Sequence, residues 1–589
     1  MLIDSLHFEN NQSKTFYPSI TFQVGKGNYH ILGGEPVIHQ LVKDFITSNK
    51  IEQFTPELSR KIFLDLPGHY AIVVLLANEV QVVTDPYAII KLYGSVVDGR
   101  VLISESFYDF PKQNYTIDKQ ALKYFFLKSY TPSQHTFFNE IFKFKPCAFY
   151  RIVGGKITEN KLYAQLGTRK IGGQKFQDEF YKLLLDSMLY YKKHFAKGTL
   201  FLSGGIDSSF LYKLLYKAGM GEWADLNVGK TVGIAKIKKT DNDYDIEYSQ
   251  RLAAENNQKV GVIEYDFSGP QVTKDFTFLR DHLFSDYGLA LGYMGYVRGA
   301  NAENVIVNGQ NADSILSFGL MGYPFYKNKR IHGLNGVFTR YFMFYGQKFR
   351  PTPLYFASKL LRKTYYSSAY KGCEIDFSDK NYMIGLGMQP RNQFYFPQDP
   401  AYNLIDQPQQ LADWFDKNYV SALLPDHLDH HAASVLLYLN TFMQGSDNRC
   451  TVLSSMLQGR QIYMPYTNLT LIELMSDLDP DWHYAYYGKY PNVVVGKKIG
   501  MPDYILERSD PVDSENTSLV NQALIDNPVF SAFLNEALAK IDLKRYEGVL
   551  SADGLEKLRK AQSAPDSNTI SFLIKVLWVD TLISKQTMQ

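Results

Sequence analysis

The sequence predicts an antiparallel β domain followed by an α/β domain that contains a parallel sheet and ends in helices. Up to about Tyr163, short apolar runs are separated by Gly, Asn and Asp, as in sheets built from hairpins. After about Gln174, runs of strand length alternate with longer helical stretches, which is typical of a parallel sheet covered by helices. We therefore predict an α+β domain over residues 1–170 and an α/β domain over residues 171–589.

The strands expected in the first domain are short. Between residues 20 and 163 they are ITFQV, HYAIVVLLA, EVQVVT, RVLIS, AFYRIV and GKITENKLY. Gly154 and Gly155 predict a tight hairpin turn between the last two strands. Residues 117–130 read as a helix that begins near Asp118, a residue type favoured at helix starts.

In the second domain, strands and helices are expected to alternate. A helix over residues 176–195 precedes the strand TLFL, a Gly-rich turn and a helix over residues 210–217. Further strands are expected at residues 231–237, 260–265 and 304–307. Beyond about residue 318 the chain becomes helical and rich in aromatic residues.

The composition of the chain indicates which classes of partner it is expected to bind and in which cellular compartment it is expected to lie. The chain has 62 Lys and Arg against 60 Asp and Glu, so its net charge of +2 does not favour nucleic acid or an anionic membrane as a partner. Three widely spaced cysteines form neither a disulfide framework nor a CxxC metal motif, which fits a reducing compartment. No apolar run reaches the roughly 18 residues of a membrane span, and the first residues lack the pattern of a signal peptide. We expect a cytoplasmic protein that binds no nucleic acid and no membrane.

A Gly-rich segment after the first strand of the second domain is the strongest functional signal. It runs from Leu202 to Ser209 and reads LSGGIDSS. Gly204 and Gly205 allow a sharp turn between strand and helix, so that backbone N–H groups at the helix start face an anion. Asp207 places a carboxylate beside that anion, which calls for a bridging cation, and Mg²⁺ with a polyphosphate supplies both charges. The alternative is a Ser- and Gly-rich helix cap that binds no ligand.

This segment resembles the pyrophosphate-binding loop (PP-loop) of N-type ATP pyrophosphatases. Most of the chain resembles the asparagine synthetase superfamily, which includes β-lactam synthetases and lasso-peptide macrocyclases. Residues 84–93 (TDPYAIIKLY) are similar to the family's ARDPFGIKPLYY hairpin, residues 308–313 (NGQNAD) to SGEGADE, and residues 500–508 (GMPDYILER) to LPxxILxR. The resemblance implies a degenerate glutamine-amidotransferase-like β sandwich over residues 1–170. It implies an ATP pyrophosphatase domain with a helical C-terminal part over residues 171–589.

The resemblance also assigns roles to individual residues. The residues implied to bind ATP are Leu202, Ser203, Gly204, Gly205, Asp207, Ser208, Ser209 and Gly309. Asp207 and Asp313 would bind Mg²⁺ and act in catalysis, because carboxylates at the ends of separate strands suit a hard cation. The alternative for Asp313 is an N-cap of the following helix. Asp245 and Glu247 fall near the family's acidic pair after the second strand.

The chain departs from the glutamine-using members of that family. Those members carry a nucleophilic cysteine directly after the initiator methionine, whereas Leu2 and Ile3 follow Met1 here, and the first cysteine is Cys147. We therefore expect no glutaminase activity. Nitrogen would come from an amine on the substrate, from a second substrate or from free ammonia.

Two further departures concern the synthetase chemistry. Gln310 stands where the family has Glu or a catalytic Tyr, and an amide orients a substrate by hydrogen bonds but cannot act as a base. The family's lysine after LPxxILxR is replaced by Asp510, preceded by Ser509. A cation near the developing negative charge is desirable, so we expect Lys498 or its neighbour Lys497 to replace it, unless the step proceeds without one.

Together these features predict an AMP-forming ligase that uses ATP to join a carboxylate to an amine in specialised natural-product biosynthesis. The expected reactions are lasso-type peptide macrolactam formation and small-molecule amidation. The expected partners are a small-molecule or peptide carboxylate, an amine and a protein that delivers the substrate. Two alternatives are a catalytically impaired nucleotide-binding scaffold or regulator and a PP-loop RNA-modifying enzyme, and the near-neutral charge argues against the latter.

Overall fold

The fold is described from a computed structural model of the chain. The described residues are 2–4, 10–11, 18–34, 36–113, 115–234, 241–282, 290–317, 353, 403–423, 430–479, 490–506, 508, 514–567 and 569–586. Among them, no helix has the length and apolar character needed to cross a bilayer. The aromatic region expected to be helical after residue 318 lies largely outside the described residues.

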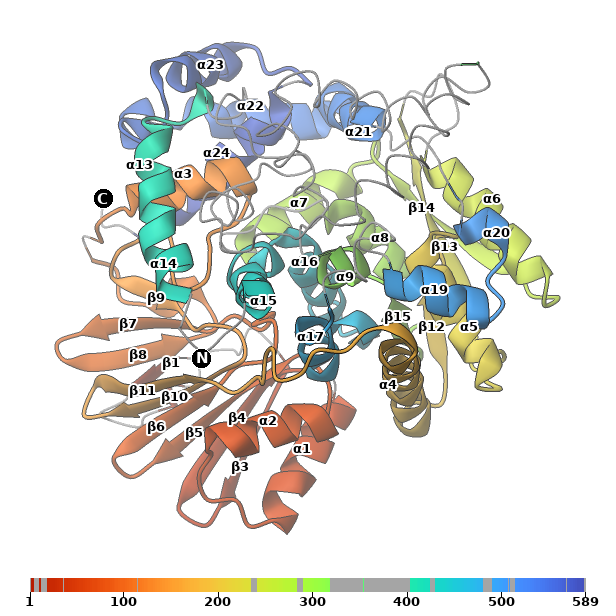
Figure 1. The fold of residues 1–589 in the computed structure, drawn as a ribbon. Coiled ribbons are helices and arrows are strands. Elements are labelled where there is room, and N and C mark those ends of the chain that lie inside the picture. Colours follow the sequence, from red (N-terminus) through yellow and green to blue (C-terminus); the bar gives the residue numbers. More distant parts are fainter. Residues whose placement is uncertain are drawn as a thin grey trace.

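Two antiparallel sheets form the first part of the chain, which we call the antiparallel domain (Figure 1). The first sheet has the order β2-β1-β8-β7-β9, with β1 Leu2–Asp4, β2 Asn10–Asn11, β7 Tyr93–Val97, β8 Arg100–Ser104 and β9 Ile141–Lys143. The second has the order β11-β10-β6-β5-β4-β3, with β3 Ser19–Val24, β4 Gly27–Gly33, β5 Tyr70–Leu76, β6 Glu79–Val83, β10 Ala148–Val153 and β11 Lys156–Leu162. The predicted antiparallel sheets are confirmed.

The six strands predicted for this domain correspond to β3, β5, β6, β8, β10 and β11. The predicted turn joins β10 to β11, and both Gly154 and Gly155 have positive φ, at 56° and 73°, as a tight hairpin turn requires. Helices α1 (Pro36–Ser48) and α2 (Pro56–Asp65) pack on the six-stranded sheet. Helix α3 (Lys119–Lys128) begins as predicted, because the Asp118 side chain accepts hydrogen bonds from two backbone amides of its first turn.

A five-stranded parallel sheet organises the second part, which we call the α/β domain. Its strands are β12 Gly198–Phe201, β13 Ala224–Val232, β14 Val260–Asp266, β15 Val305–Asn308 and β16 Ile462–Tyr463. The order β14-β13-β12-β15-β16 has the first strand in the middle, with the chain winding outwards in one direction and then in the other. In such doubly wound sheets the ligand crevice lies where the direction reverses, here between the C-terminal ends of β12 and β15.

Two sequence predictions in this domain are wrong in their bounds. The second parallel strand is β13, residues 224–232, so it begins seven residues before the predicted start at residue 231, and residues 235–237 lie outside the described residues. The error has a physical reason: Asn227, Gly229 and Lys230 interrupt the apolar pattern in the middle of β13, so a continuous apolar run begins only near the end of the strand. Helix α5 (Ile206–Lys217) begins before the predicted residue 210, which places Asp207 inside its first turn.

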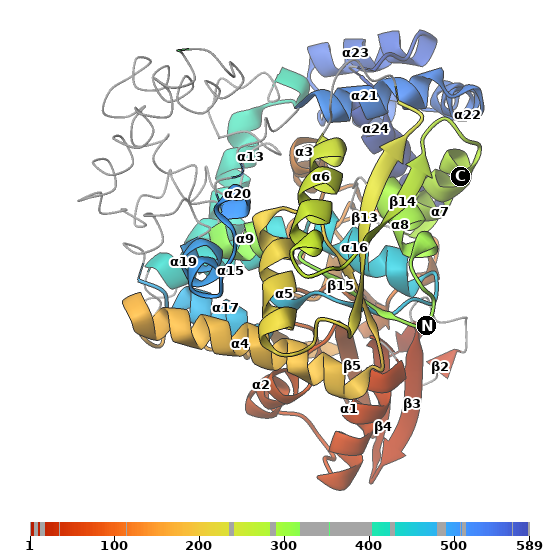
Figure 2. The same ribbon diagram turned by 90° about the vertical axis from the view of Figure 1, so that its right-hand side faces the viewer.

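Helices make up most of the rest of the α/β domain, and several of them cover the two faces of the parallel sheet (Figure 2). Their bounds are α4 Gly173–His194, α6 Asp241–Ala254, α7 Gln271–His282, α8 Ala290–Gly299, α9 Ala312–Ser317, α13 Pro408–Phe415, α14 Ser421–Leu423, α15 His430–Asn440, α16 Ser446–Met456, α17 Leu469–Ser476, α19 Tyr490–Lys498, α20 Asp503–Leu506, α21 Ser514–Asp526, α22 Pro528–Ala539, α23 Ala552–Ser563 and α24 Ile570–Gln586. Helices α5 and α6 lie on one side, and α8 packs on the other. The predicted helical C-terminal part is therefore confirmed.

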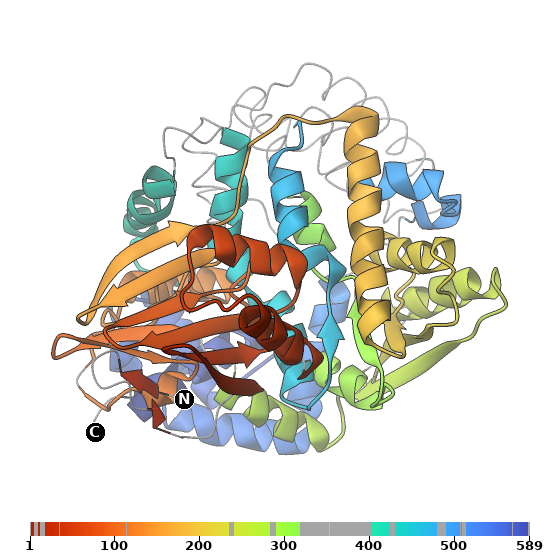
Figure 3. The ribbon, with the colours of Figure 1, turned by 90° about the horizontal axis from the view of Figure 1, so that it is seen from below.

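The two domains are in direct contact. Seen from below, the antiparallel sheets lie beside α17 and α4 (Figure 3). The last helix reaches back as well, because Lys575 Nζ donates to the carbonyl of Phe126 at 2.8 Å and Gln586 Nε2 to that of Phe110 at 3.0 Å. Buried apolar residues of both domains belong to one continuous cluster. The boundary between residues 170 and 171 stays a prediction.

Candidate functional site

A cavity of about 300 Å³ lies at the C-terminal ends of β12 and β15 and beside the middle of β13. Phe201 of β12 pairs with Asn308 of β15, so the segments that follow these two strands leave the sheet side by side. The cavity is lined by residues from both segments. The sheet topology alone predicts a ligand crevice at this position.

The Gly-rich loop closes on itself through its serines. Ser208 Oγ accepts a hydrogen bond from Ser203 N at 3.1 Å and lies 3.1 Å from Ser203 Oγ. Gly204 has φ of +65°, and a Cβ there would lie 2.5 Å from Cβ of Tyr248, so only glycine fits. Gly205 is the N-cap of α5, and it brings no side chain between the first amides of the helix and the cavity. The helix start is thereby available to an anion.

The second motif packs against the start of this helix. A Cβ on Gly309 would lie 3.1 Å from Ser208 N, so the two backbones approach closely. Asn311 adopts φ of +78°, which asparagine tolerates better than most residues, and its side chain donates to the carbonyl of Tyr466 at 3.1 Å. Both motifs predicted from the sequence therefore meet at one cavity.

Asp207 lines the cavity from the first turn of α5. Its Oδ1 accepts a hydrogen bond of 2.6 Å from Nδ2 of Asn492, a fully buried residue of α19. Asp313 follows Ala312 at the start of α9, on the segment that leaves β15. The side chain of Asp313 lies outside what the structure describes, so its predicted role as a second magnesium ligand stays a prediction.

Asp245 of α6 also lines the cavity, whereas Glu247 is exposed and is not part of its lining. Asp245 Oδ1 accepts from a guanidinium nitrogen of Arg508 at 2.7 Å, and the other terminal nitrogen of Arg508 donates to the carbonyl of Ser203 at 3.0 Å. The guanidinium carbon also lies 4.7 Å from the centre of the Tyr248 ring. Arg508 thus holds α6 and the Gly-rich loop together.

Two amides face the cavity from the second motif. Gln310 Oε1 accepts a hydrogen bond of 3.0 Å from the hydroxyl of Tyr293, so its amide nitrogen is the group left to meet a ligand. Asn308 Oδ1 accepts from the backbone amide of Gln310 at 2.8 Å, which fixes the orientation of that side chain. The Asn308 Nδ2 donor is buried and has no hydrogen-bond partner among the described residues. A buried donor of this kind at a cavity wall requires an acceptor from a ligand or from water.

Not all of the predicted residues reach the cavity. Leu202, Ser203, Gly205, Ser208, Gly309 and Gln310 line it together with Asp207. Gly204 instead packs against Tyr248, and Ser209 is fully buried outside the cavity lining.

Lys498 does not line the cavity either, and its Nζ donates to Gln174 Oε1 of α4 at 2.5 Å. Helix α19 causes this placement, because six residues of helix carry Lys498 about 9 Å along the axis from Asn492. This position does not support the prediction that Lys498 is the catalytic cation.

Several residues at the site were not predicted from the sequence. Tyr293 and Tyr296 lie three residues apart on one face of α8, a spacing that also fits an ordinary core helix. Asn308 carried a weak signal, because the similar family motif begins with Ser and not Asn. The contact of Asn492 with Asp207 had no signal, since 285 residues separate them.

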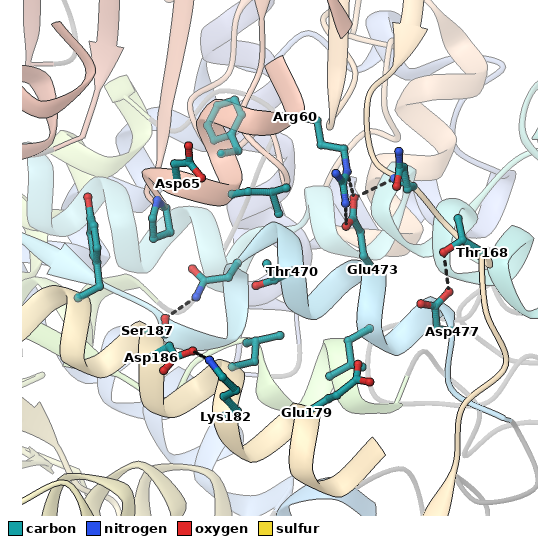
Figure 4. A pocket seen from close by; sticks show the side chains of 18 of the residues that line it. Arg60, Asp65, Thr168, Glu179, Lys182, Asp186, Ser187, Thr470, Glu473 and Asp477 are labelled. Carbon is teal, nitrogen blue, oxygen red and sulfur yellow. Dashed lines mark hydrogen bonds and ion pairs between the residues drawn. The ribbon is translucent and has the colours of Figure 1, made fainter. Parts of the chain in front are cut away.

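A larger cavity of about 770 Å³ lies between α2, α4, α17 and the segment that joins the two domains (Figure 4). Its charges form pairs. Arg60 donates to Glu473 through Nε at 2.8 Å and through Nη2 at 2.6 Å, and Arg169 Nε donates to Asp477 at 2.8 Å. Lys182 pairs with Asp186 one helical turn away. None of the predicted site residues lines this cavity, and its Arg60–Glu473 pair joins the two domains. We therefore place the functional site at the smaller cavity.

Comparisons with known proteins bear on the family of the chain. A search of curated proteins finds no match. Among solved structures, the chain is similar to glutamine phosphoribosylpyrophosphate amidotransferase from B. subtilis complexed with ADP and GMP, at 12% identity and a TM-score of 0.15. That match covers 50% of this chain and 59% of the other, so the chain spans about three fifths of that structure, and a TM-score this low carries no argument. The family model of asparagine synthase matches residues 180–561, which is more than half of the sequence, and the chain therefore belongs to the asparagine synthase family.

Proposed function

We propose that this chain is an ATP-dependent ligase that adenylates a substrate carboxylate and transfers the acyl group to an amine. The observation that carries the proposal is the cavity at the reversal point of the parallel sheet, with the Gly-rich loop, the start of α5 and Asp207 in its wall. Family membership supports ATP-dependent amide formation in general. The AMP-forming, glutamine-independent reaction is the more specific part of the proposal.

The residues present fit a nucleotide polyphosphate. Amides at the start of α5 and the glycines of both motifs offer backbone close to a ligand, because Gly205 and Gly309 have no side chains there. The unpartnered donor of Asn308 adds a group that suits a phosphate or carboxylate oxygen.

The residues also fit Mg²⁺. This ion binds proteins through one or two carboxylates and keeps phosphate oxygens and water as its other ligands. Asp207 would hold it, with Asp313 as the second expected ligand. The ion supplies charge neutralisation for the departing pyrophosphate. It therefore does not need a cluster of three His, Cys, Asp or Glu, and the described residues contain none.

The proposed reaction has two steps. The substrate carboxylate attacks the α-phosphorus of ATP, pyrophosphate leaves, and an acyl-adenylate forms. The amine then attacks the acyl carbon, loses a proton, and AMP leaves. Gln310 would orient the substrate through its amide nitrogen, since its oxygen is engaged by Tyr293. Arg508 donates to the carbonyl of Ser203 in the Gly-rich loop. Its positive charge would stabilise the loop while negative charge develops on the departing pyrophosphate.

We propose that the nitrogen donor is an amine or ammonia and not glutamine. Cys147, the one cysteine whose side chain falls within the described residues, is fully buried, and burial raises the pKa of its thiol well above the usual value. A thiol held neutral in this way is a poor nucleophile. A peptide that closes into a macrolactam and a small carboxylic acid are both candidate substrates, and a partner protein that delivers the substrate remains part of the proposal.

ATP–pyrophosphate exchange tests the proposal. Labelled pyrophosphate should enter ATP when a panel of peptide and small-molecule carboxylates is supplied with Mg²⁺. Asp207→Ala should reduce exchange by at least about a hundredfold, as expected when a charged group that acts in the transition state is removed. Asp553→Ala is the matched control, because Asp553 also lies in the first turn of a helix but far along the chain in α23.

The outcomes separate the alternatives. Exchange that needs Asp207 and not Asp553 supports a ligase. Binding of ATP without exchange for any carboxylate would indicate the nucleotide-binding scaffold or regulator. If the Asp207→Ala variant shows unchanged exchange, the proposed position of the active site is wrong.

A further inference from the structure

We propose that the antiparallel domain positions the magnesium ligand Asp207 through a hydrogen-bond relay that runs from Tyr87 through Tyr466 and Asn492. This inference rests on the proposed function, because it assigns a role to residues behind the same cavity. It also gives a function to a domain for which we expect no glutaminase activity. In this relay the three residues are positioning residues, since they act on Asp207 and do not line the cavity.

The relay begins in the turn after β6. Tyr87 is buried, and its hydroxyl donates to the backbone carbonyl of Tyr466 at 3.2 Å. The same carbonyl accepts from Asn311 of the second motif at 3.1 Å. Burial raises the pKa of Tyr87 well above its usual value, so its hydroxyl keeps its proton and stays a donor. The carbonyl of Tyr466 thus accepts one hydrogen bond from each domain.

Tyr466 carries the contact from its backbone to its side chain. Its ring is fully buried, and its hydroxyl lies 3.3 Å from both the carbonyl oxygen of Asp207 and Oδ1 of Asn492. That hydroxyl has one hydrogen for its two acceptors. When it donates to Oδ1 of Asn492, it favours the amide orientation in which the nitrogen points the other way. The nitrogen points at Asp207, whose Oδ1 it meets at 2.6 Å.

This orientation matters for the carboxylate. If the Asn492 amide turned over, its oxygen would face the negative charge of Asp207, and the contact would become repulsive. The hydroxyl of Tyr466 opposes that rotation when it donates to Oδ1 of Asn492, and the carbonyl of Tyr466 in turn accepts a hydrogen bond from Tyr87. Groups that orient a metal-binding carboxylate in this way commonly affect metal affinity tenfold or more. Helix α19 lies beside α5, which brings Asn492 within reach (Figure 1).

Isothermal titration calorimetry of ATP, with Mg²⁺ at a series of concentrations and with EDTA in its place, tests the relay without requiring a substrate. Asn492→Ala should raise the Mg²⁺ concentration needed for half-maximal tightening of ATP binding about tenfold. Tyr87→Phe removes one neutral hydrogen bond and should raise it roughly threefold. Binding of ATP in EDTA should be unchanged, since the relay acts on the metal ligand. Tyr466→Phe serves as a second variant if Asn492→Ala does not fold, and it should match Asn492→Ala in direction.

Tyr163→Phe is the matched control. Its hydroxyl is also buried and also donates to a backbone carbonyl, that of Thr84 at 2.7 Å, but this contact stays inside the antiparallel domain. The Mg²⁺ dependence should not change in this variant. In a relay, Tyr87→Phe should have little further effect once Asn492 is replaced by Ala.

The results distinguish failure of the relay from failure of the function. If the wild-type protein binds ATP equally well with Mg²⁺ and with EDTA, the proposed metal site is wrong and the relay falls with it. If the wild-type protein responds to Mg²⁺ and both Asn492→Ala and Tyr466→Phe show the same Mg²⁺ dependence as the wild type, the relay alone is wrong. An equal loss in Tyr87→Phe and Tyr163→Phe also overturns it, because that result indicates a general effect on the domain.

Discussion

The pKa of His69 depends on its burial at the contact between the two domains. The side chain is buried, its Nε2 lies 3.2 Å from Oγ1 of Thr467 in the α/β domain, and burial lowers its pKa to about 3. The imidazole is therefore neutral in the folded protein at any pH above that value. In the unfolded chain an exposed histidine takes up a proton near pH 6.5.

The sign of the pH effect follows from this difference. Between about pH 6.5 and 3 the unfolded state holds a proton that the folded state does not, so stability falls as the pH falls. His69 alone should contribute about 1.4 kcal/mol per pH unit to the free energy of unfolding well below pH 6.5. Urea unfolding of the wild-type protein and of His69→Gln, from pH 7.5 down to pH 5, measures this slope. The variant should lose less stability on acidification, and its difference from the wild type at pH 7.5 gives the packing cost to subtract. Parallel curves would contradict the prediction.

Single residues also mark the limit of prediction from sequence. The types Gly, Asp and Ser in LSGGIDSS predicted a loop at an anion site because their backbone and charge properties are local. Lys498 and Asn492 lie on the same helix, yet only Asn492 faces Asp207, and the direction of that helix depends on packing with α5 and α4. No local pattern encodes such a direction. The same holds for Asn308, whose unpartnered donor appears only once the neighbouring contacts are known.

At the scale of elements, the turn from β12 to α5 depends on Gly204. Its φ of +65° costs an alanine roughly 1–2 kcal/mol, and a Cβ would also lie 2.7 Å from Ser249 N. Gly204→Ala should therefore push α6 away from the loop and weaken ATP binding at least about tenfold, because loop and helix start would both shift. Calorimetric titration with ATP and Mg²⁺ measures the loss.

Gly219 provides a control in the same unit. It follows the C-terminal end of α5, it has the same φ of +65°, and a Cβ there would meet nothing within 4 Å. Gly219→Ala should lower stability by about 1 kcal/mol through backbone strain alone and leave ATP affinity unchanged. Equal losses of ATP affinity in both variants would show that strain, and not the contact with α6, is responsible.

The elements themselves were predictable where the pattern is local. The hairpin strands of the antiparallel domain and α3 with its Asp118 cap match the prediction because turn residues and caps are specified within a few positions. β13 was misplaced because Asn227, which lines the cavity, together with Gly229 and Lys230 interrupts its apolar pattern. Strands β4, β7 and β9 were not predicted. β9 has three residues and pairs with β7, which lies far earlier in the sequence, so no local pattern marks it.

For the whole molecule, the proposed relay depends on the interface between the two domains, which we call the joint. A hydrogen bond of 3.2 Å from Tyr87 can orient Tyr466 only if the antiparallel domain is held firmly on the α/β domain. Arg60 of α2 and Glu473 of α17 supply one such contact, with two parallel hydrogen bonds and limited exposure, 27% and 12% of their side chains. Glu473 also accepts from the backbone of Gln165 in the connecting segment at 2.9 Å.

A double-mutant cycle measures this joint. Arg60→Met keeps the aliphatic stem, and Glu473→Gln keeps an acceptor for Gln165 N, so the cycle isolates the ion pair. We expect a coupling of about 1 kcal/mol, because bidentate geometry strengthens the pair while partial exposure screens it. The exposed pair Lys540–Glu536, at 69% and 72% exposure, is the control and should show weaker coupling than Arg60 and Glu473, because solvent screens it more. If the two domains act as one unit, Arg60→Met should also raise the Mg²⁺ requirement for ATP binding in the direction expected for Tyr87→Phe, whereas the variants of the control pair should not. A stable Arg60→Met protein with an unchanged Mg²⁺ requirement would mean that the Arg60–Glu473 pair stabilises the joint without helping to set the position of Asp207.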